Sequence, residues 1–508
     1  MSEALPGMSR PAAAANRPRD AAAVILFRRT PAGPELFWLK RDKLLRFAGG
    51  FYAFPGGRVD RGDAAVPVEG ADAAEAPLIA AAARELLEEA GVLVAAGAER
   101  VSQSELEVIR KALLEKKEAF EQLLAQRGLR LRRSDFRDAG RWITPAFMPV
   151  RFDARFFLVE APAQANPEIW PGELTEGGWI RPTDALQRWT KGTALLHPPL
   201  LHALRVFESF TTPEAAAEQL KKPAYCPGNV PSRIEFQRGI HVFPLETLTL
   251  PPATHTNTWI LGNGELLIVD PGSPEVRQYA RLLALIAGFV AEGRRPKAVF
   301  LTHHHADHIG GALAVKERLK IPIWCHERTA DRLPDRAVNR LVGEGDVLEL
   351  QGSPPMRFRV VHTPGHARGH LCLVDEVSSA AIVGDMVAGI GSIVIDPPEG
   401  DMAEYIAQLA RLRDLGVRTL YPAHGPPIPD GPGKLDEYIL HRQHRERLVL
   451  DAVAHGARSL KEVVARAYKD TAEGMHPVAE RSALAILIKL TREGKVVRKD
   501  DRYSTTAG

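Results

Sequence analysis

Short apolar runs that end in polar or glycine residues recur along most of this chain. The runs at 267–269, 298–301 and 381–383 have the length and composition of buried strands. Between such runs, apolar residues also recur at helical spacing. The segment 78–90 carries one apolar stripe and stops at Gly91, which favours a helix that ends in a left-handed glycine. The mixture predicts a multidomain α/β protein.

Further amphipathic stretches lie at 105–127 and beyond residue 438. The first predicts one charged helix, with Ser102 or Ser104 as its N-cap and Gly128 at its end. The second predicts a long basic helix from 438, a helix that Ser459 caps, a third helix over 478–493 and a short strand over 494–497. Three helices followed by a β-wing describe a small winged-helix domain.

Length and composition set the number of domains. The 508 residues are enough for two to four of them. Hydrophobic residues make up 45% and charged residues 25%, as in ordinary globular proteins, and the net charge of +3 excludes a strongly basic polyanion binder. We expect a disordered tail over 1–20, domains over 21–205, 236–433 and 434–508, and a proline-rich linker over 206–235.

The cysteines and the N-terminus bear on the compartment. Cys226, Cys325 and Cys372 show no C-x-x-C spacing, which fits a reducing compartment. No apolar run is long enough to span a membrane, so no membrane partner is expected. Residues 1–20 lack the apolar core of a signal peptide, although an organelle transit peptide is an alternative. We expect a cytoplasmic protein, and the oligomeric state stays open.

The six residues from His303 to His308 carry the densest chemistry of the chain. His303 and His305 alternate, and Asp307 and His308 lie just beyond them. Imidazole and carboxylate ligands this close together suit zinc, with iron or manganese as alternatives. A surface histidine cluster would lack the apolar strand before it and the aspartate within it. We therefore predict a metal site in a loop at a strand end.

The spacing His-x-His-x-Asp-His resembles the motif of the metallo-β-lactamase superfamily. Four further elements occur in the family's order: Asp270 after an apolar run, Thr-Pro-Gly-His ending at His366, Gly-Asp ending at Asp385, and Pro-Ala-His-Gly around His424. The resemblance implies an αββα sandwich that holds two metals. It assigns His303, His305 and His366 to one metal, Asp307, His308 and His424 to the other, and Asp385 to the bridge between them.

Two Zn²⁺ ions, or iron or manganese in their place, would activate water and stabilise negative charge. The resemblance therefore implies hydrolysis of a carbonyl or phosphoryl centre, with Asp307, His308 and Asp385 in catalytic roles. His370 is similar to a histidine of glyoxalase II-like members and is expected to support the ligands or to contact substrate. His304 and His362 are expected to be packing or strand-end residues.

A second constellation lies nearer the N-terminus, on the predicted helix 78–90. Glu85, Glu88 and Glu89 share one face at i, i+3 and i+4. Three like charges at this spacing repel one another unless a divalent cation lies among them. The alternative is a solvated acidic face, which is common on helices.

The segment 84–92 resembles the Arg-Glu-x-x-Glu-Glu half of the Nudix box, and the Phe-Pro-Gly-Gly turn at 54–57 resembles its start. The resemblance implies a Nudix α/β/α fold in which Glu88 and Glu89 bind Mg²⁺ or Mn²⁺, Glu85 is a ligand or base, and Arg84 orients the glutamates. The longer spacing is similar to CoA-diphosphatase-like members. Ala76 stands where the standard box has Glu, so the resemblance leaves two alternatives for this fold, diphosphate hydrolysis or binding without hydrolysis. Glu173 or Glu176 is expected to add a late carboxylate.

The tail from residue 434 carries 15 Lys and Arg against 11 Asp and Glu, a net charge of +4, which is small for nucleic-acid binding. The order of the elements, with Thr256-Asn257-Thr258 near the start, resembles the lactamase-beta-2-like group, which includes a single-strand-specific endoribonuclease. The substrate is therefore expected to be a thioester, of acyl-CoA or glutathione type, or single-stranded RNA. In an alternative hypothesis the Nudix-like domain is an inactive nucleotide or CoA sensor that regulates an endoribonuclease. The tail itself would bind nucleic acid, cover the active site or mediate dimerisation.

Overall fold

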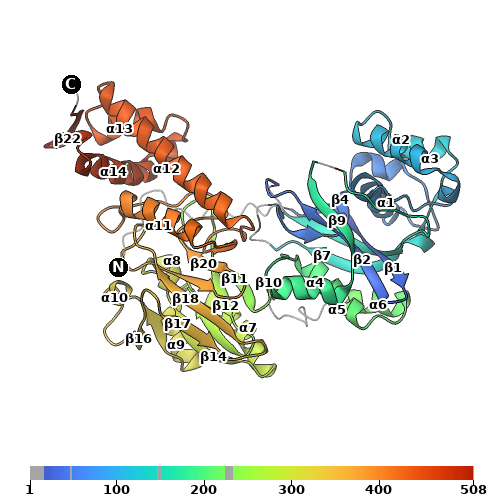
Figure 1. Ribbon diagram of the computed structural model, residues 1–508, viewed down its shortest axis with the longest axis horizontal. Helices are drawn as coiled ribbons and strands as arrows, with labels where there is room; N and C mark the ends of the chain where they lie inside the picture. Colours follow the sequence, from blue (N-terminus) through green and yellow to red (C-terminus); the bar gives the residue numbers. More distant parts are fainter. Residues whose placement is uncertain are drawn as a thin grey trace. The chain divides into compact units, whose positions relative to one another are not determined.

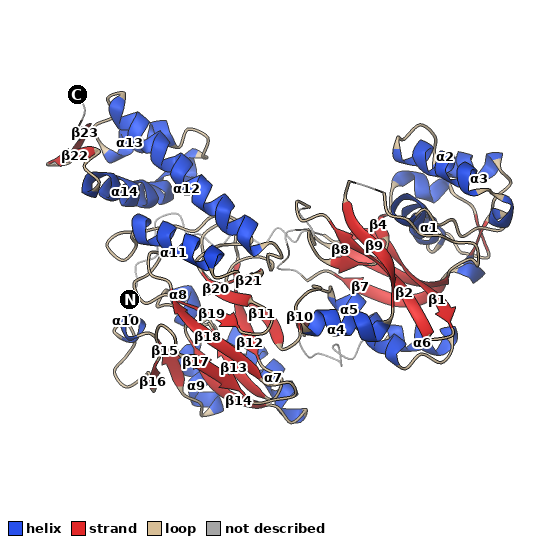
Figure 2. Cartoon of the chain, in the orientation of Figure 1, coloured by secondary structure: helices blue, strands red, loops and turns tan. Residues whose placement is uncertain are grey.

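A computed structural model of the chain describes residues 17–45, 48–145, 148, 150–170, 172–222 and 233–506. These residues form two compact units that divide between Arg238 and Gly239, shown by sequence position in Figure 1 and by secondary structure in Figure 2. Most of the predicted tail over 1–20 lies outside the described residues, and so does Cys226. The first strand already begins at Arg19, inside that predicted tail.

The first unit is built on one mixed sheet. The order along the sheet is β3-β2-β1-β8-β7, with β4 beside β1 and β9 beside β2. Strands β1 and β8 run parallel, whereas β2 and β7 run antiparallel to their neighbours. The strands are β1 (Arg19–Thr30), β2 (Gly33–Arg41), β3 (Tyr52–Ala53), β4 (Gly56–Arg58), β7 (Arg137–Ile143), β8 (Phe152–Glu160) and β9 (Leu174–Ile180).

Strand β1 places its alternate side chains in two separate cores, as the two-residue period of a strand requires. Val24 and Leu26 pack with α1, α2 and α3, while Ile25 and Phe27 pack with α4, α5 and α6. The sheet is therefore the middle of three layers, with α1, α2 and α3 on one face and α4, α5 and α6 on the other (Figure 1). These helices are α1 (Ala76–Ala90), α2 (Gln103–Leu114), α3 (Phe120–Gln126), α4 (Pro182–Thr190), α5 (Pro198–Glu208) and α6 (Pro213–Leu220).

Two predictions for this unit were wrong. The single helix expected over 105–127 is divided into α2 and α3, because Lys116 adopts a left-handed conformation with φ of +52°. The segment expected to be a linker begins as structured chain: α6 buries Ala216, Ala217 and Leu220 in the core of the unit. Residues 223–232 of that segment lie outside the described residues. The helix expected over 78–90 is confirmed as α1, and Gly91 ends it with φ of +67°.

The second unit begins with two sheets. Strands β11 to β16 follow one another in chain order in the first sheet, and β17 to β21 do so in the second. The first sheet contains β11 (Ile240–Glu246), β12 (His255–Leu261), β13 (Glu265–Val269), β14 (Arg295–Phe300), β15 (Ile323–Cys325) and β16 (Arg340–Leu341). The second contains β17 (Val347–Leu350), β18 (Met356–His362), β19 (Leu371–Asp375), β20 (Ala380–Gly384) and β21 (Thr419–Pro422).

Helices cover the outer faces of these sheets. Buried side chains of α7 and α9 share one core with β11 to β15, and α11 shares another with β19 to β21. Trp259 of β12 meets Tyr421 of β21 edge-on at 5.0 Å between ring centroids, so the two sheets face each other. The helices are α7 (Val276–Ala291), α8 (Ala306–Ile309), α9 (Ala312–Leu319), α10 (Glu327–Ala330) and α11 (Met402–Asp414).

Three helices and a hairpin complete the second unit, as the sequence predicts. They are α12 (Gly431–Ala454), α13 (Leu460–Ala467), α14 (His476–Arg492), β22 (Val496–Lys499) and β23 (Arg502–Thr505). Ser459 caps α13 through the backbone N–H of Glu462. One continuous core runs from Leu409 of α11 through Tyr438 of α12 to Ile486 of α14. The tail is thus packed against the sandwich.

The remaining elements are short. They are η1 (Arg61–Ala65), β5 (Val68–Glu69), η2 (Ala98–Arg100), β6 (Leu131–Arg132), η3 (Arg133–Asp135), β10 (Ile234–Gln237) and η4 (Glu473–Met475). Cys325 and Cys372 are buried free thiols. Among the described residues, no helix combines the length and apolar character that a membrane span needs.

Candidate metal centre

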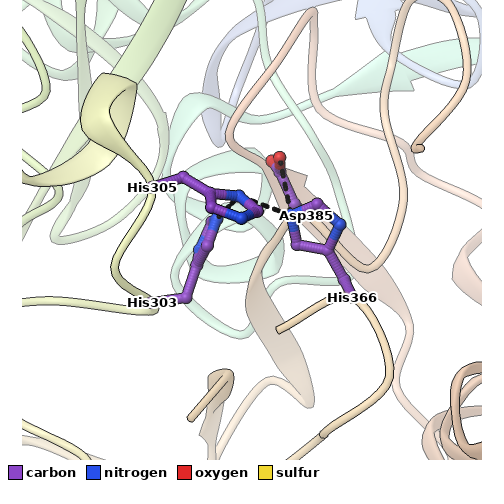
Figure 3. A group of neighbouring side chains, drawn as sticks. All are labelled: His303, His305, His366 and Asp385. Atoms are coloured by element: carbon purple, nitrogen blue, oxygen red, sulfur yellow. Dashed lines mark hydrogen bonds and ion pairs between the residues drawn. The ribbon is translucent and has the colours of Figure 1, made fainter. Parts of the chain in front are cut away.

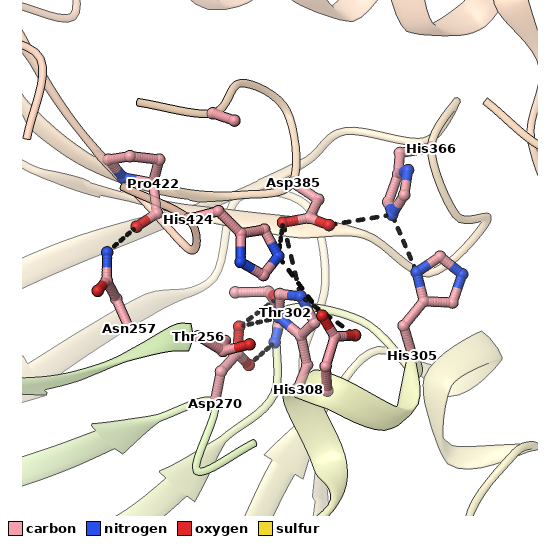
Figure 4. Close-up of polar contacts among 12 residues, drawn as sticks. Thr256, Asn257, Asp270, Thr302, His305, His308, His366, Asp385, Pro422 and His424 are labelled. Carbon is pink, nitrogen blue, oxygen red and sulfur yellow. Dashed lines mark hydrogen bonds and ion pairs between the residues drawn. The ribbon is translucent and has the colours of Figure 1, made fainter. Parts of the chain in front are cut away.

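The predicted ligands of the second unit lie just beyond strand ends, except Asp307 and His308, which lie on α8. His303 and His305 follow β14, Asp385 follows β20 and His424 follows β21. His366 lies in the turn between β18 and β19. These strand ends and the β18–β19 turn meet at one edge of the sandwich, so side chains that are 119 residues apart in the sequence, such as His305 and His424, come together there (Figure 4).

Three histidines and one aspartate form the first cluster (Figure 3). His305 Nδ1 lies 2.9 Å from His303 Nε2 and 3.0 Å from His366 Nε2. Asp385 Oδ2 lies 3.5 Å from His366 Nε2. The four ligand atoms lie within 4.8 Å of one another. Ligands of one tetrahedral zinc ion lie roughly 3.3 Å apart, given Zn–N bonds of about 2.0–2.1 Å, so the cluster has the dimensions of one metal site.

The second cluster lies on the other side of Asp385. His308 Nε2 and His424 Nε2 lie 3.5 and 3.4 Å from Asp385 Oδ1. Asp307 Oδ2 lies 3.5 Å from His424 Nε2. The two oxygens of Asp385 therefore face different clusters, which is the arrangement of a carboxylate that lies between two sites (Figure 4).

The outer nitrogens of three rings face fixed acceptors. His366 Nδ1 lies 2.9 Å from Val394 O, and His424 Nδ1 lies 3.0 Å from His255 O. His308 Nδ1 lies 2.8 Å from Asp270 Oδ2. A carbonyl or carboxylate oxygen only accepts, so each Nδ1 carries a hydrogen, and the neutral form of each ring presents its Nε2 lone pair inward. This is how metal-binding histidines are usually oriented.

Asp270 supports the cluster through hydrogen bonds to Thr302 and His308. Its Oδ1 accepts from Thr302 N at 2.8 Å, and its Oδ2 accepts from the Thr302 hydroxyl at 2.6 Å. That hydroxyl lies 3.0 Å from His303 Nδ1. Because the hydroxyl gives its hydrogen to Asp270, it accepts from His303, whose Nε2 is then also a lone pair.

Asn257 of the Thr-Asn-Thr element fixes the chain on both sides of His424. Its side-chain amide donates to Pro422 O at 2.9 Å and to Gly425 O at 2.8 Å. The neighbouring Thr258 hydroxyl donates to Asp270 O at 2.9 Å. The element thus ties the end of β21 to the end of β13.

Burial and the neighbouring charges set the protonation of these groups. Burial lowers the pKa of His303 and His305 well below the usual value, and nearby rings lower it further, so both are neutral ligands at neutral pH. Burial alone would raise the pKa of Asp385, but His424 and His308 hold it well below its usual range. The carboxylates around His308 raise its pKa well above normal, against the effect of burial.

The residues fit a pair of metal ions. The lone pairs of His303 and His366 both point at His305 Nδ1, and one ring hydrogen cannot satisfy both of them. His308 Nε2 and Asp385 Oδ1 are buried and have no hydrogen-bond partner, which is costly for polar atoms unless a cation lies between them. His303, His305 and His366 would hold one ion, and Asp307, His308 and His424 the other.

The other histidines are placed as follows. His370 is buried, and its Nε2 accepts from Asp385 N at 3.1 Å, so it supports the bridging aspartate. His362 ends β18 and stacks on His326 at 4.3 Å between ring centroids. His304 has a buried Nδ1 without a hydrogen-bond partner.

In the first unit, α1 brings the three predicted glutamates against strand β4. Glu89 Oε2 accepts from Gly56 N at 2.8 Å. Burial raises the pKa of Glu85 to about 7 and that of Glu89 to about 8, and it also raises the pKa of Glu88. The carboxyls of Glu85 and Glu89 would therefore titrate near neutral pH in the absence of a cation.

Arg84 lies next to these glutamates. It is held by Asp63, which the resemblance to the Nudix box did not indicate. Asp63 of η1 accepts from Arg84 Nε at 2.9 Å and from Arg84 Nη2 at 3.0 Å. Arg84 Nη1 donates to Glu85 at 2.8 Å and to Glu88 at 3.4 Å. Asp63 is only 1% exposed. It lies in the segment between the Phe-Pro-Gly-Gly turn and α1, 21 residues from Arg84, and gave no sequence signal beyond its charge.

The expected late carboxylate is not one group. Glu173 contributes to the raised pKa of Glu89, so it lies near the acidic face. Glu176 instead accepts from the Tyr52 hydroxyl at 2.7 Å and pairs with Arg188 at 3.4 Å.

Two known protein families match successive parts of the second unit. Residues 251–424 match the Metallo-beta-lactamase superfamily. Residues 459–504 match the Beta-lactamase associated winged helix domain.

Curated relatives match the same region. A Beta-lactamase-like protein 2 homolog from Caenorhabditis elegans is 30% identical over 247 residues, which is 47% of this chain and 80% of the relative. An Atrochrysone carboxyl ACP thioesterase from Aspergillus chevalieri is 32% identical over 255 residues, which is 47% of this chain and 77% of the relative.

A solved structure is similar to the other region. The NUDIX hydrolase from Alicyclobacillus acidocaldarius is 29% identical, with a TM-score of 0.35, over 40% of this chain and 97% of that structure.

Proposed function

The chain belongs to the metallo-beta-lactamase superfamily, and we propose that its second unit is a dinuclear metal-dependent thioester hydrolase. The observation that carries the proposal is the convergence of His303, His305, His366, Asp385, Asp307, His308 and His424 in two adjoining clusters. The acyl group would be carried on CoA, on glutathione or on a carrier protein.

The chemistry follows from the ligand set. Two bound Zn²⁺ ions, or iron or manganese, would supply a nucleophile at neutral pH and stabilise the negative charge on the attacked carbonyl. Asp385 would hold the pair together, because its two oxygens face different clusters. Asp307 and His308 would complete the second site and place the reacting carbonyl against it. Asp270 and Thr302 would keep the His303 and His308 rings in their metal-binding orientation.

Two observations favour a thioester over single-stranded RNA. One relative is an ACP thioesterase, and the match to this chain extends over 77% of its length. In addition, cations of the winged-helix part are engaged within the unit: Arg445 pairs with Asp470, Lys489 with Glu446, and Arg498 with Asp501. Cations that bind phosphates must be free to do so, and these three are held by carboxylates of the same unit.

A substrate panel separates the two possibilities. Acetyl-CoA, an S-acyl glutathione and a single-stranded RNA are offered to the full chain at low and moderate salt. We expect thioester turnover that changes little with salt and no RNA cleavage. RNA cleavage that falls steeply with salt, without thioester turnover, would contradict the proposal and favour the nuclease of the lactamase-beta-2-like group.

We further propose that the first unit has a Nudix fold and hydrolyses a CoA-type or nucleoside diphosphate with Mg²⁺ or Mn²⁺. Glu88 and Glu89 would bind the cation, and Glu85 would be a ligand or base. The Asp63–Arg84 clamp supports activity, because it supplies an acidic partner for Arg84 where Ala76 offers none. A thioesterase that releases CoA and a unit that cleaves CoA would act on one molecule in sequence.

Glu89→Gln tests this second activity. The variant should lose at least 100-fold of the Mn²⁺-dependent hydrolysis of CoA or NADH and keep the thioester hydrolysis of the second unit. Glu107→Gln, on the exposed face of α2, is the matched control and should keep both. If the wild-type chain cleaves no diphosphate at saturating Mg²⁺ or Mn²⁺, the first unit is a binding module, as in the sensor hypothesis.

A further inference from the structure

The segment 386–401 joins the bridging Asp385 to helix α11 and runs along the metal-ligand clusters. It contacts two ligands through its backbone. Val394 O faces His366 Nδ1 at 2.9 Å, and Gly389 N donates to His424 O at 2.7 Å. The position of this segment therefore decides where the His366 ring points.

Helix α12 holds the segment from outside the sandwich. The Tyr438 hydroxyl accepts from Ala388 N at 3.0 Å. Arg442 Nη2 donates to Ile393 O at 2.5 Å and to the Ser392 hydroxyl at 3.2 Å. Arg442 thus binds the carbonyl of the residue immediately before Val394.

Helix α14 holds the segment on the other side of Val394. The Ser482 hydroxyl accepts from Ile395 N at 3.3 Å, and Arg481 pairs with Asp396 at 3.5 Å. The winged-helix part therefore contacts both neighbours of the one carbonyl that orients His366.

Arg442 is an unusual residue for such a place. It is 4% exposed, its Nε has no hydrogen-bond partner, and no carboxylate among the described residues forms an ion pair with it. It lies over the rings of Tyr405 and Tyr438, at 5.3 and 5.9 Å from their centroids. A buried cation without a partner carboxylate costs free energy that an apolar side chain of the same size would not. Packing alone does not account for an arginine here.

We propose that the winged-helix part braces the metal centre, with Arg442 as the positioning residue that sets the His366 ring through Ile393 and Val394. This inference rests on the proposed dinuclear site. The winged-helix part would then support hydrolysis directly, and this role does not require nucleic-acid binding.

Cobalt binding to the full chain tests the brace without relying on activity. Metal-stripped protein is titrated with Co²⁺, and the visible spectrum reports the geometry of the ligands. Arg442→Met should bind at least one Co²⁺ roughly tenfold more weakly than wild type, with an altered spectrum. Arg442→Lys should recover part of the loss, because an ammonium group still donates to Ile393 O. Ser482→Ala should give a smaller change in the same direction.

Two controls separate positioning from general loss of stability. Arg447→Met alters an exposed cation of the same helix, and Val463→Ala opens a cavity in the fully buried core of α13. At a temperature where circular dichroism shows every variant folded, both should give the wild-type spectrum. An unchanged spectrum in Arg442→Met, or an equal change in Val463→Ala, would overturn the brace. Failure of wild type to bind Co²⁺ would overturn the proposed function and the brace with it.

Discussion

Burial changes the acidity of two glutamates in the first unit. Glu85 and Glu89 are ordinary helix glutamates by sequence. Against strand β4 they become groups with pKa values of about 7 and about 8. Their folded-state pKa values lie above those of the unfolded chain, so the folded unit holds more protons between about pH 4.5 and 8. The free energy of unfolding of the metal-free unit therefore falls as pH rises through this range.

The first prediction follows from that sign. Mn²⁺ affinity of the first unit should rise between about pH 6 and 8.5, because bound glutamates must be deprotonated. Calorimetric titration at several pH values measures it. Glu89→Gln should also raise the metal-free melting temperature more at pH 8.5 than at pH 5.5, whereas Glu107→Gln should not. A flat affinity over this pH range would be incompatible with metal binding by these carboxyls.

The site residues differ in how far the sequence alone could identify them. Four ligands lie within the six residues from His303 to His308, and His366, Asp385 and His424 follow apolar runs at strand ends. The structure brings all of them together. Asp63 could not be identified in this way, because its pairing with Arg84 depends on the path of the chain between β4 and α1. The Val394 carbonyl could not be identified either, because every residue type has a backbone carbonyl.

At the scale of elements, the contact of β4 with α1 decides the shape of the acidic face. A Cβ atom added to Gly57 would lie 2.3 Å from Glu85 Oε1. Gly57→Ala should therefore displace the Glu85 carboxylate and reduce diphosphate hydrolysis at least tenfold, leaving thioester hydrolysis unchanged. Kinetics on both substrates check this. Gly62→Ala is the control, since an added Cβ there meets no atom within 4 Å. Equal loss in both variants would rule out the steric explanation.

Helices with one clear apolar stripe and a clear end were predictable, as α1 with Gly91 and α13 with Ser459 show. The break between α2 and α3 was not, because it depends on the left-handed Lys116, and lysine has no particular preference for that conformation. Helix α6 was missed because prolines around it indicate a connector. Its alanines are stabilised by tertiary packing, which local sequence does not report.

At the scale of the whole molecule, the sequence predicted the winged helix but not its attachment. The shared core of α11, α12 and α14 joins residues far apart in the chain. Removal of the chain from residue 434 would strip Leu435, Tyr438 and Val449 from that core, so loss of activity after truncation would not identify a substrate. Point substitutions such as Arg442→Met test the role of the winged-helix part without removing its core residues.

The central claim is that two metal ions held by seven side chains hydrolyse a thioester. Elemental analysis of freshly purified chain, with thioester turnover measured on the same samples, tests it most directly. Wild type should contain about two transition-metal ions per chain. Asp385→Ala should lose at least one ion and nearly all turnover, while Glu89→Gln should keep both ions and full turnover. Full thioester turnover by protein that contains no transition metal would contradict the claim.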